Sequence, residues 1–123
     1  MYQTALDSNL TNLAIRQKTL PPDHPELGRL YNNIGYNYAK LRQVPLAKVY
    51  FEKFQAVNAS GRVYRNWAMY HALQNDVFSA LENLKKAVSL GYNDLKWIET
   101  DDSLENIRGE KGYRELVERL KKQ

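Results

Sequence analysis

Apolar residues recur at steps of three and four along most of this chain, which is the spacing of one face of an α-helix. The first run covers residues 1–20 and ends at two consecutive prolines, which cannot continue a helical hydrogen-bond ladder. The apolar faces of the four runs that follow are Tyr31, Ile34, Gly35, Tyr38 and Leu41; Leu46, Ala47, Tyr50, Phe51 and Phe54; Tyr64, Trp67, Ala68 and His71; and Ala80, Leu81, Leu84, Ala87 and Val88. No run alternates as a strand does, so the sequence predicts an all-α fold.

Capping residues and prolines separate these predicted helices. The expected starts are Asp23 as an N-cap with Pro25 in the first turn, Pro45 in another first turn, and Ser60 and Asp76 as N-caps. Gly91 is expected to end the fifth helix in a left-handed conformation. These boundaries predict two consecutive helical hairpins after the first helix.

The two hairpins repeat each other when Ala47 is aligned with Ala80. The segment "YNNIGYNYAKLRQVPLAKVYF" then lies over "YRNWAMYHALQNDVFSALENL". This alignment also places Tyr31 on Tyr64, Gly35 on Ala68, and Ala39 on Ala72. Ala5 precedes Ala47 by a longer interval than Ala47 precedes Ala80, so half a unit with a longer connection comes before the first complete one.

Small and aromatic residues recur at fixed places in these units. The small residues are Gly35, Ala47, Ala68, Ala80 and Ala87, and the aromatic ones are Tyr31, Tyr38 and Phe51. This pattern resembles the tetratricopeptide repeat, a helix–turn–helix unit of about 34 residues. Residues 2–57, with "PDHP" before "NNIG", are most similar to the variety found in kinesin light chains. The tail from "LGYNDLKW" onward is similar to the short helices that close bacterial repeat arrays.

The resemblance implies a right-handed solenoid of helical hairpins with about two full repeats, a leading half repeat and short capping helices. It assigns residues 1–90 to the repeats and residues 91–123 to capping helices of the same domain. Departures from the family pattern are Asn9, Asn12, Phe54 and His71. The two Asn residues either mark a polar outer face on a capping helix, as terminal repeats require, or indicate that the chain is a truncated or engineered fragment.

Composition narrows the class of protein. The 123 residues carry a net charge of +4 and are 43% hydrophobic and 26% charged, which is ordinary for a globular domain. There is no Cys, which excludes disulfides and thiolate chemistry and suits a reducing, cytoplasmic setting. No apolar run approaches the roughly 18 residues of a membrane span. We therefore expect no membrane association and, because the basic excess is slight, no nucleic-acid partner.

An enzyme active site is not expected. The two histidines, His24 and His71, lack metal-ligand spacing and fit a cap or exposed position and a packed position, respectively. The carboxylates Asp94, Asp101 and Asp102 stand where helix starts are expected, and capping explains them. We expect no catalytic residues, no metal and no cofactor. The apolar tail residues are expected to cover the end of the last repeat; they are Trp97, Ile98, Leu104, Ile107, Leu116, Val117 and Leu120.

A polar row along the second predicted helix is the candidate binding site. Residues spaced four, three and four apart share one face of a helix. The row consists of Arg29, Asn33, Tyr36 and Lys40 with Asn32 at its edge, and its equivalent in the next hairpin is Arg62, Asn66, Met69 and Leu73 with Arg65 beside it. None of these residues is acidic. The alternative is that both rows are solvated helix faces with no binding function.

The resemblance gives this row a function. Tetratricopeptide modules commonly bind peptides in the concave groove that their first helices line, and some clamp an acidic C-terminus with an Asn and basic residues. Asn33 and Arg62 match two clamp positions, whereas Arg65 is one residue from a third position, which holds Asn66. We therefore expect a non-enzymatic module that binds an acidic peptide segment or C-terminus. The alternative is a structural scaffold, with the chain a monomer or a homodimer formed through the unpaired N-terminal helix.

Overall fold

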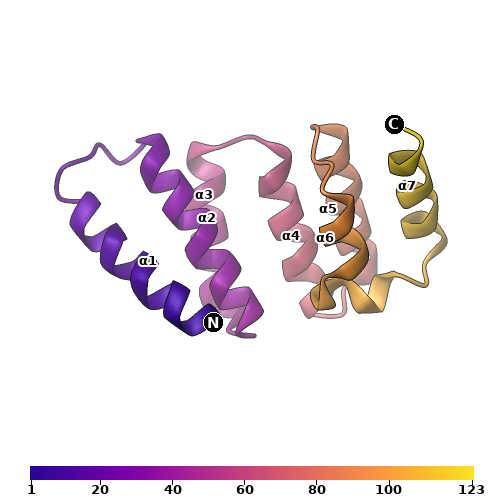
Figure 1. The fold of residues 1–123 in the computed structure, drawn as a ribbon, viewed down its shortest axis with the longest axis horizontal. Helices are drawn as coiled ribbons and strands as arrows, with labels where there is room; N and C mark the ends of the chain where they lie inside the picture. Colours follow the sequence, from indigo (N-terminus) through magenta and orange to yellow (C-terminus); the bar gives the residue numbers. More distant parts are fainter. The chain divides into compact units, whose positions relative to one another are not determined.

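The computed structural model describes all of residues 1–123 and contains helices but no strands, which confirms the all-α prediction (Figure 1). The elements are α1 (Tyr2–Arg16), α2 (Pro25–Lys40), α3 (Val44–Val57), α4 (Gly61–Leu73), α5 (Val77–Ser89), α6 (Leu95–Thr100), the 3₁₀ helix η1 (Asp102–Ile107) and α7 (Lys111–Lys121). None of these helices is both long enough and apolar enough to traverse a lipid bilayer. The chain divides into two compact units, Met1–Ala59 and Ser60–Gln123.

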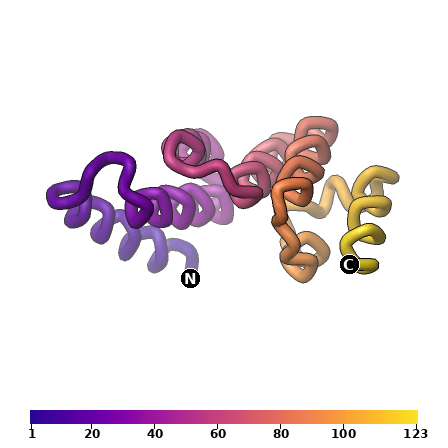
Figure 2. Tube along the Cα trace, turned by 90° about the horizontal axis from the view of Figure 1, so that it is seen from above, coloured from indigo at the N-terminus to yellow at the C-terminus, as the bar shows by residue number.

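The first unit is the α2–α3 hairpin with α1 beside it. Helices α1 and α2 run side by side and are joined by the loop over residues 17–24 (Figures 1 and 2). Leu6 and Leu13 are the buried residues of α1. The largest fully buried side chains of the hairpin are Leu27, Leu30, Ile34 and Phe51.

The packing around Gly35 explains why α2 contains this poor helix former in its interior. A Cβ at this position would lie 2.5 Å from Cδ1 and 2.6 Å from Cε1 of Phe51, closer than real Cβ contacts. The bare backbone of α2 therefore leaves room for the Phe51 ring of α3, which is almost fully buried. This close approach offsets the roughly 1 kcal/mol that glycine costs within a helix.

The second unit is the α4–α5 hairpin covered by the C-terminal helices. Its core cluster joins hairpin residues to tail residues: Ala68, Ala72, Ala80, Leu84 and Ala87 with Tyr92, Ile98, Leu104, Ile107, Tyr113, Leu116, Val117 and Leu120; Trp97 is partly buried against them. The predicted apolar cover is therefore confirmed. Gly61 permits a second close approach, because a Cβ there would lie 2.5 Å from the carbonyl oxygen of Ala87.

Polar contacts also hold the tail in the second unit. The Tyr113 hydroxyl donates to the carbonyl oxygen of Ile98 at 3.0 Å. Nδ2 of Asn106 donates to the carbonyl oxygen of Ala72 at 2.8 Å and to Oδ1 of Asn75 at 2.9 Å. These bonds tie α6 to α7 and η1 to the turn between α4 and α5. The tail is therefore fixed in orientation as well as buried.

The two hairpins share the same turn geometry at equivalent positions of the repeat. Arg42 and Asn75 both adopt a left-handed backbone, with φ of 62° and 60°. In each turn the following residue donates to a carbonyl of the preceding helix, Gln43 to Tyr38 at 2.9 Å and Asp76 to His71 at 2.9 Å. The left-handed residue itself donates to Ala39 in one turn and to Ala72 in the other, at 3.0 Å in both. This is the Schellman arrangement.

A cation–aromatic contact also recurs at equivalent positions of the two hairpins. The Lys53 ammonium lies 5.8 Å from the Tyr31 ring centroid, and the Lys86 ammonium lies 4.8 Å from that of Tyr64. Each pair joins the first helix of a hairpin to its second helix. The alignment of the two sequences is thus matched by local structure within each hairpin.

Several helix boundaries in the structure differ from those predicted from the sequence. The first helix ends at Arg16 rather than near residue 20. The N-cap of α2 is His24, whose Nδ1 accepts from the backbone N–H of Glu26 at 3.1 Å, and not Asp23. Ser60 stands at the N-cap of α4 without a side-chain capping bond. Asp76 caps α5 through Ser79, and Gly91 is left-handed with φ of 101°, as predicted.

Candidate functional site

The predicted row on α2 reaches the surface of the first unit along its length. The Arg29 side chain is 55% exposed, and Asn33, Tyr36 and Lys40 are partly exposed. Asn32, at the edge of the row, is only 7% exposed and belongs to the interior. The row therefore offers cations near its two ends, with a carboxamide and a phenol between them.

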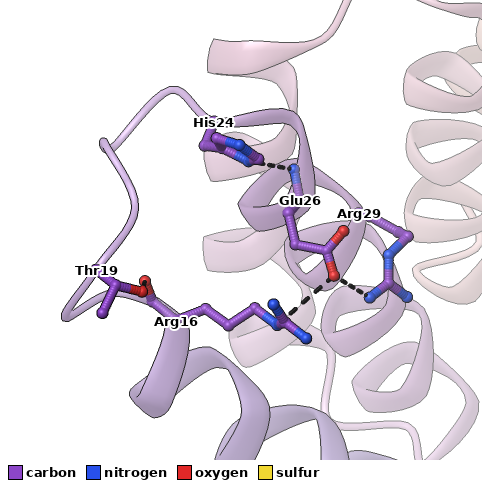
Figure 3. A network of polar contacts seen from close by, with 5 residues as sticks. All are labelled: Arg16, Thr19, His24, Glu26 and Arg29. Carbon is purple, nitrogen blue, oxygen red and sulfur yellow. Dashed lines mark hydrogen bonds and ion pairs between the residues drawn. The ribbon is translucent and has the colours of Figure 1, made fainter.

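Helix α1 adds residues to this surface that sequence reasoning missed. At one end, Oε1 of Glu26 accepts from Nη2 of Arg29 at 2.6 Å and lies 3.6 Å from Nε of Arg16 (Figure 3). The hydrogen bond from Arg29 holds the pKa of the Glu26 carboxyl below its usual value, and the same bond raises the pKa of Arg29. Glu26 and Arg29 therefore remain charged at neutral pH, and Glu26 bridges the guanidinium groups of Arg29 and Arg16.

The other end of the row is built on aromatic contacts. The Tyr2 ring of α1 meets the Tyr36 ring of α2 edge-on, with centroids 6.4 Å apart and planes at 60°. The Lys40 ammonium lies 5.6 Å from the centroid of the Tyr2 ring. Tyr2 therefore supports both the phenol and the cation of the row.

We call this surface the α1–α2 face, and its residues are Tyr2, Arg16, Glu26, Arg29, Asn33, Tyr36 and Lys40. It carries three cations and one carboxylate, a net charge of +2. The predicted row itself contains no acidic residue, and the carboxylate is added by Glu26, which lies one helical turn before Arg29. Arg16 of α1 offsets the charge of Glu26, so the net charge is +2 rather than +1.

The equivalent row of the second unit differs in exposure. Asn66 and Met69 have 0% exposed surface, and Arg65 has 7%, whereas Arg62 is exposed. Of this row, only Arg62 is exposed. We therefore leave Arg65, Asn66 and Met69 out of the candidate site.

Arg65 is held by aromatic residues of its own unit. Its guanidinium carbon lies 5.0 Å from the Trp97 ring centroid and 5.7 Å from that of Tyr92, and its Nε donates to Oδ1 of Asn66 at 2.9 Å. Burial raises the pKa of the Tyr92 hydroxyl, so this ring stays neutral beside the cation. Arg65 thus links α4 to α6 within the core.

Other polar groups form no comparable arrangement. His71 lies 3.8 Å from the Asp76 carboxylate, and this pair stands at the turn before α5. The chain has no group of three His, Asp or Glu side chains placed to hold a metal ion. Two open hollows in the second unit are lined by charges of both signs: one by Tyr64, Glu82, Asn83, Lys85, Lys86 and Ser89, the other by Lys85, Gly112, Glu115, Glu118, Arg119 and Lys122.

Comparison with known proteins identified no relative of this chain. No family model matches the sequence, and no curated protein and no solved structure is significantly similar to it. The function of the chain is therefore inferred from its own residues and their geometry.

Proposed function

We propose that this chain is a tetratricopeptide-like interaction module, a right-handed solenoid of helical hairpins, whose α1–α2 face binds an acidic peptide segment. The observation that carries the proposal is the exposed, net positive row along α2 with its two added residues from α1. The matched Schellman turns and Tyr–Lys contacts of the two hairpins support a repeat architecture. The proposal includes no catalytic activity.

The groups on the face suit a peptide ligand. The Asn33 carboxamide carries both a donor and an acceptor, so it can bond a peptide N–H or carbonyl. Arg16 and Arg29 provide planar guanidinium groups that pair with carboxylates, and Lys40 provides a compact charge. Tyr36 offers an aromatic surface next to these polar groups. An acidic segment would satisfy all of them at once.

Peptide binding tests the proposal. A fluorescein-labelled library of acidic peptides should contain binders whose affinity falls as salt increases, because exposed charge pairs are screened. The double variant Arg29→Ala, Lys40→Ala should weaken such binders at least tenfold, about 1.4 kcal/mol. The matched control is Lys48→Ala, which removes an exposed cation from α3 and should leave binding nearly unchanged. The proposal fails if no acidic peptide binds at low salt, or if the control and the double variant behave alike.

Self-association through α1 is the second candidate, and one observation favours it. Ile15 of α1 is a large apolar side chain with 59% of its surface exposed, which a second copy of the chain could cover. The contrary observation is that Leu6 and Leu13 are already buried. Sedimentation over a range of protein concentrations distinguishes the outcomes. A dimer that dissociates in the Ile15→Glu variant would support self-association, and a monomer at every concentration would exclude it.

A further inference from the structure

We infer that His24 makes the joint between α1 and α2 sensitive to pH: the neutral imidazole holds the joint closed, and protonation in mild acid loosens it. The joint consists of the loop over residues 17–24 and the first turn of α2. This regulatory device lies outside the proposed function and holds whatever the α1–α2 face binds. It depends on the hydrogen bond that caps α2, on the charges around the imidazole, and on the ion pairs of the capped residue.

One imidazole nitrogen caps the first turn of α2. Pro25 has no N–H, and the N–H groups of Leu27 and Gly28 donate to the carbonyl oxygen of His24 at 3.0 and 3.3 Å. The remaining N–H of this turn belongs to Glu26, and it donates to Nδ1 of His24 at 3.1 Å (Figure 3). The N–H groups at a helix start have no partner within the helix, so they depend on such caps. The start of α2 therefore depends on Nδ1 of His24.

This cap exists only while the imidazole is neutral. Nδ1 accepts the hydrogen bond through its lone pair, and a proton on that nitrogen turns the acceptor into a donor. The added charge also lies at the N-terminus of α2, where the helix dipole disfavours cations. Histidine side chains change charge between about pH 5 and 8, whereas an Asn in the same place would accept the bond throughout this range. Because a proton on Nδ1 excludes the capping bond, mild acid favours the uncapped form.

The charged groups around His24 balance one another. Asp23 precedes it in the loop, Glu26 and Arg29 lie on α2, and Arg16 belongs to α1. The last turn of α3, which packs against the first turn of α2, carries no charged residue. The two carboxylates attract an imidazolium and the two guanidinium groups repel it, so the four charges sum to zero. The loss of the capping bond therefore decides how the joint responds to acid.

Loss of the cap weakens the contact between α1 and α2. The residue whose N–H is capped also carries the carboxylate that bridges the two helices, because Oε1 of Glu26 lies 2.6 Å from Nη2 of Arg29 and 3.6 Å from Nε of Arg16 (Figure 3). When the first turn of α2 frays, the backbone no longer fixes Glu26, and the bridge to Arg16 loosens with it. The buried side chains of Leu6 and Leu13 still hold α1. Mild acid should thus open this end of the joint without unfolding the first unit.

The second histidine responds in the opposite direction. Nδ1 of His71 lies 3.8 Å from Oδ2 of Asp76, so a proton on His71 adds an attraction instead of removing a hydrogen bond. The chain has two histidines in all. The response of His24 is therefore measured in the His71→Gln background, where His24 is the one histidine left.

Thermal unfolding followed by circular dichroism tests the cap in this background. Between about pH 7.5 and about pH 5.5, the melting temperature should fall by about 3–5 °C more with His24 than with His24→Asn, the size expected for one lost N-cap. The variant His24→Ala has no cap at either pH, so its melting temperature should already be lower at the higher pH and should show no such extra fall. Equal falls for His24 and His24→Asn overturn the inference, and so does an equally large fall for His24→Ala.

NMR on the ¹⁵N-labelled chain shows where the change occurs. At about pH 7.5 the ring proton of His24 should be on Nε2, because Nδ1 accepts the capping bond. The backbone amide signal of Glu26 should move with the same pH midpoint as the imidazole, and in His24→Asn it should stay fixed over this range. The amide of Ser79, which Asp76 caps, is the matched control and should stay fixed in both proteins. A ring proton on Nδ1, or a Glu26 amide that does not follow the imidazole, overturns the inference.

Discussion

The packing of Gly35 against Phe51 gives the sharpest prediction about stability. In Gly35→Ala the new methyl would lie 2.5 Å from the Phe51 ring, which is 1% exposed and cannot swing into solvent. Overpacking of this kind costs about 1–3 kcal/mol. The higher helix propensity of Ala should add about 1 kcal/mol to the free energy of unfolding. The expected net loss is therefore about 1 kcal/mol, or about 3–5 °C in the melting temperature of a chain of this size.

The second hairpin shows how this clash can be relieved. Its positions equivalent to Gly35 and Phe51 are Ala68 and Leu84, so a larger helix residue there faces a smaller partner in the core of the second unit. Phe51→Leu alone should cost about 1 kcal/mol through the space it leaves. The double variant Gly35→Ala, Phe51→Leu should be nearly as stable as the wild type, a coupling of at least about 1 kcal/mol.

Urea denaturation followed by circular dichroism measures all four members of this cycle. Ala68→Gly is the matched control, because it should lower stability by losing helix propensity without relieving any clash. The reasoning is refuted if Gly35→Ala is as stable as the wild type, or if the two substitutions in the first hairpin are simply additive.

Three further predictions concern single groups. Arg42→Gly should raise stability by about 0.5–1 kcal/mol, because φ of 62° strains any residue with a Cβ; a lower urea midpoint would contradict this. The hydrogen bond from the Ser79 backbone holds the pKa of Asp76 below its ordinary 3.8, so this cap stabilises the fold fully above that value and is lost as the pH falls through the lower folded pKa. Asp76→Asn, which still caps, should flatten the decline of stability with acid between pH 5 and 2, and an unchanged acid transition would refute it. Arg65→Ala should destabilise the second unit by about 1–3 kcal/mol and shift the fluorescence of Trp97, which it stacks on; an unchanged melting curve would show that this contact is dispensable.

Local features of the fold were predictable because short-range physics decides them. The periodicity indicated the first five helices, Pro25 and Pro45 marked the starts of two of them, Gly91 marked the end of α5, and the internal repeat identified two similar hairpins. The N-cap of α2 was misplaced by one residue because Asp23 and His24 both precede Pro25 and both can accept a backbone N–H. The sequence favours Asp for that role, and only the backbone geometry shows that His24 fills it.

The candidate site was predictable only where one helix carries it. Arg29 and Lys40 share a face of α2, which periodicity reveals. Arg16 and Tyr2 join that face because α1 packs beside α2. A local sequence pattern does not show which residues of two different helices will be in contact. The same limit explains Asn66 and Met69, since periodicity shows which residues share a face but not which face becomes covered.

The most direct test of the account is an NMR titration of the ¹⁵N-labelled chain with an acidic peptide. The account predicts saturable shifts at the Nε–H groups of Arg16 and Arg29 and at the Asn33 side-chain amide, with Lys48 unaffected. Shifts confined to α3 or to the second unit, or none at low salt, would contradict it.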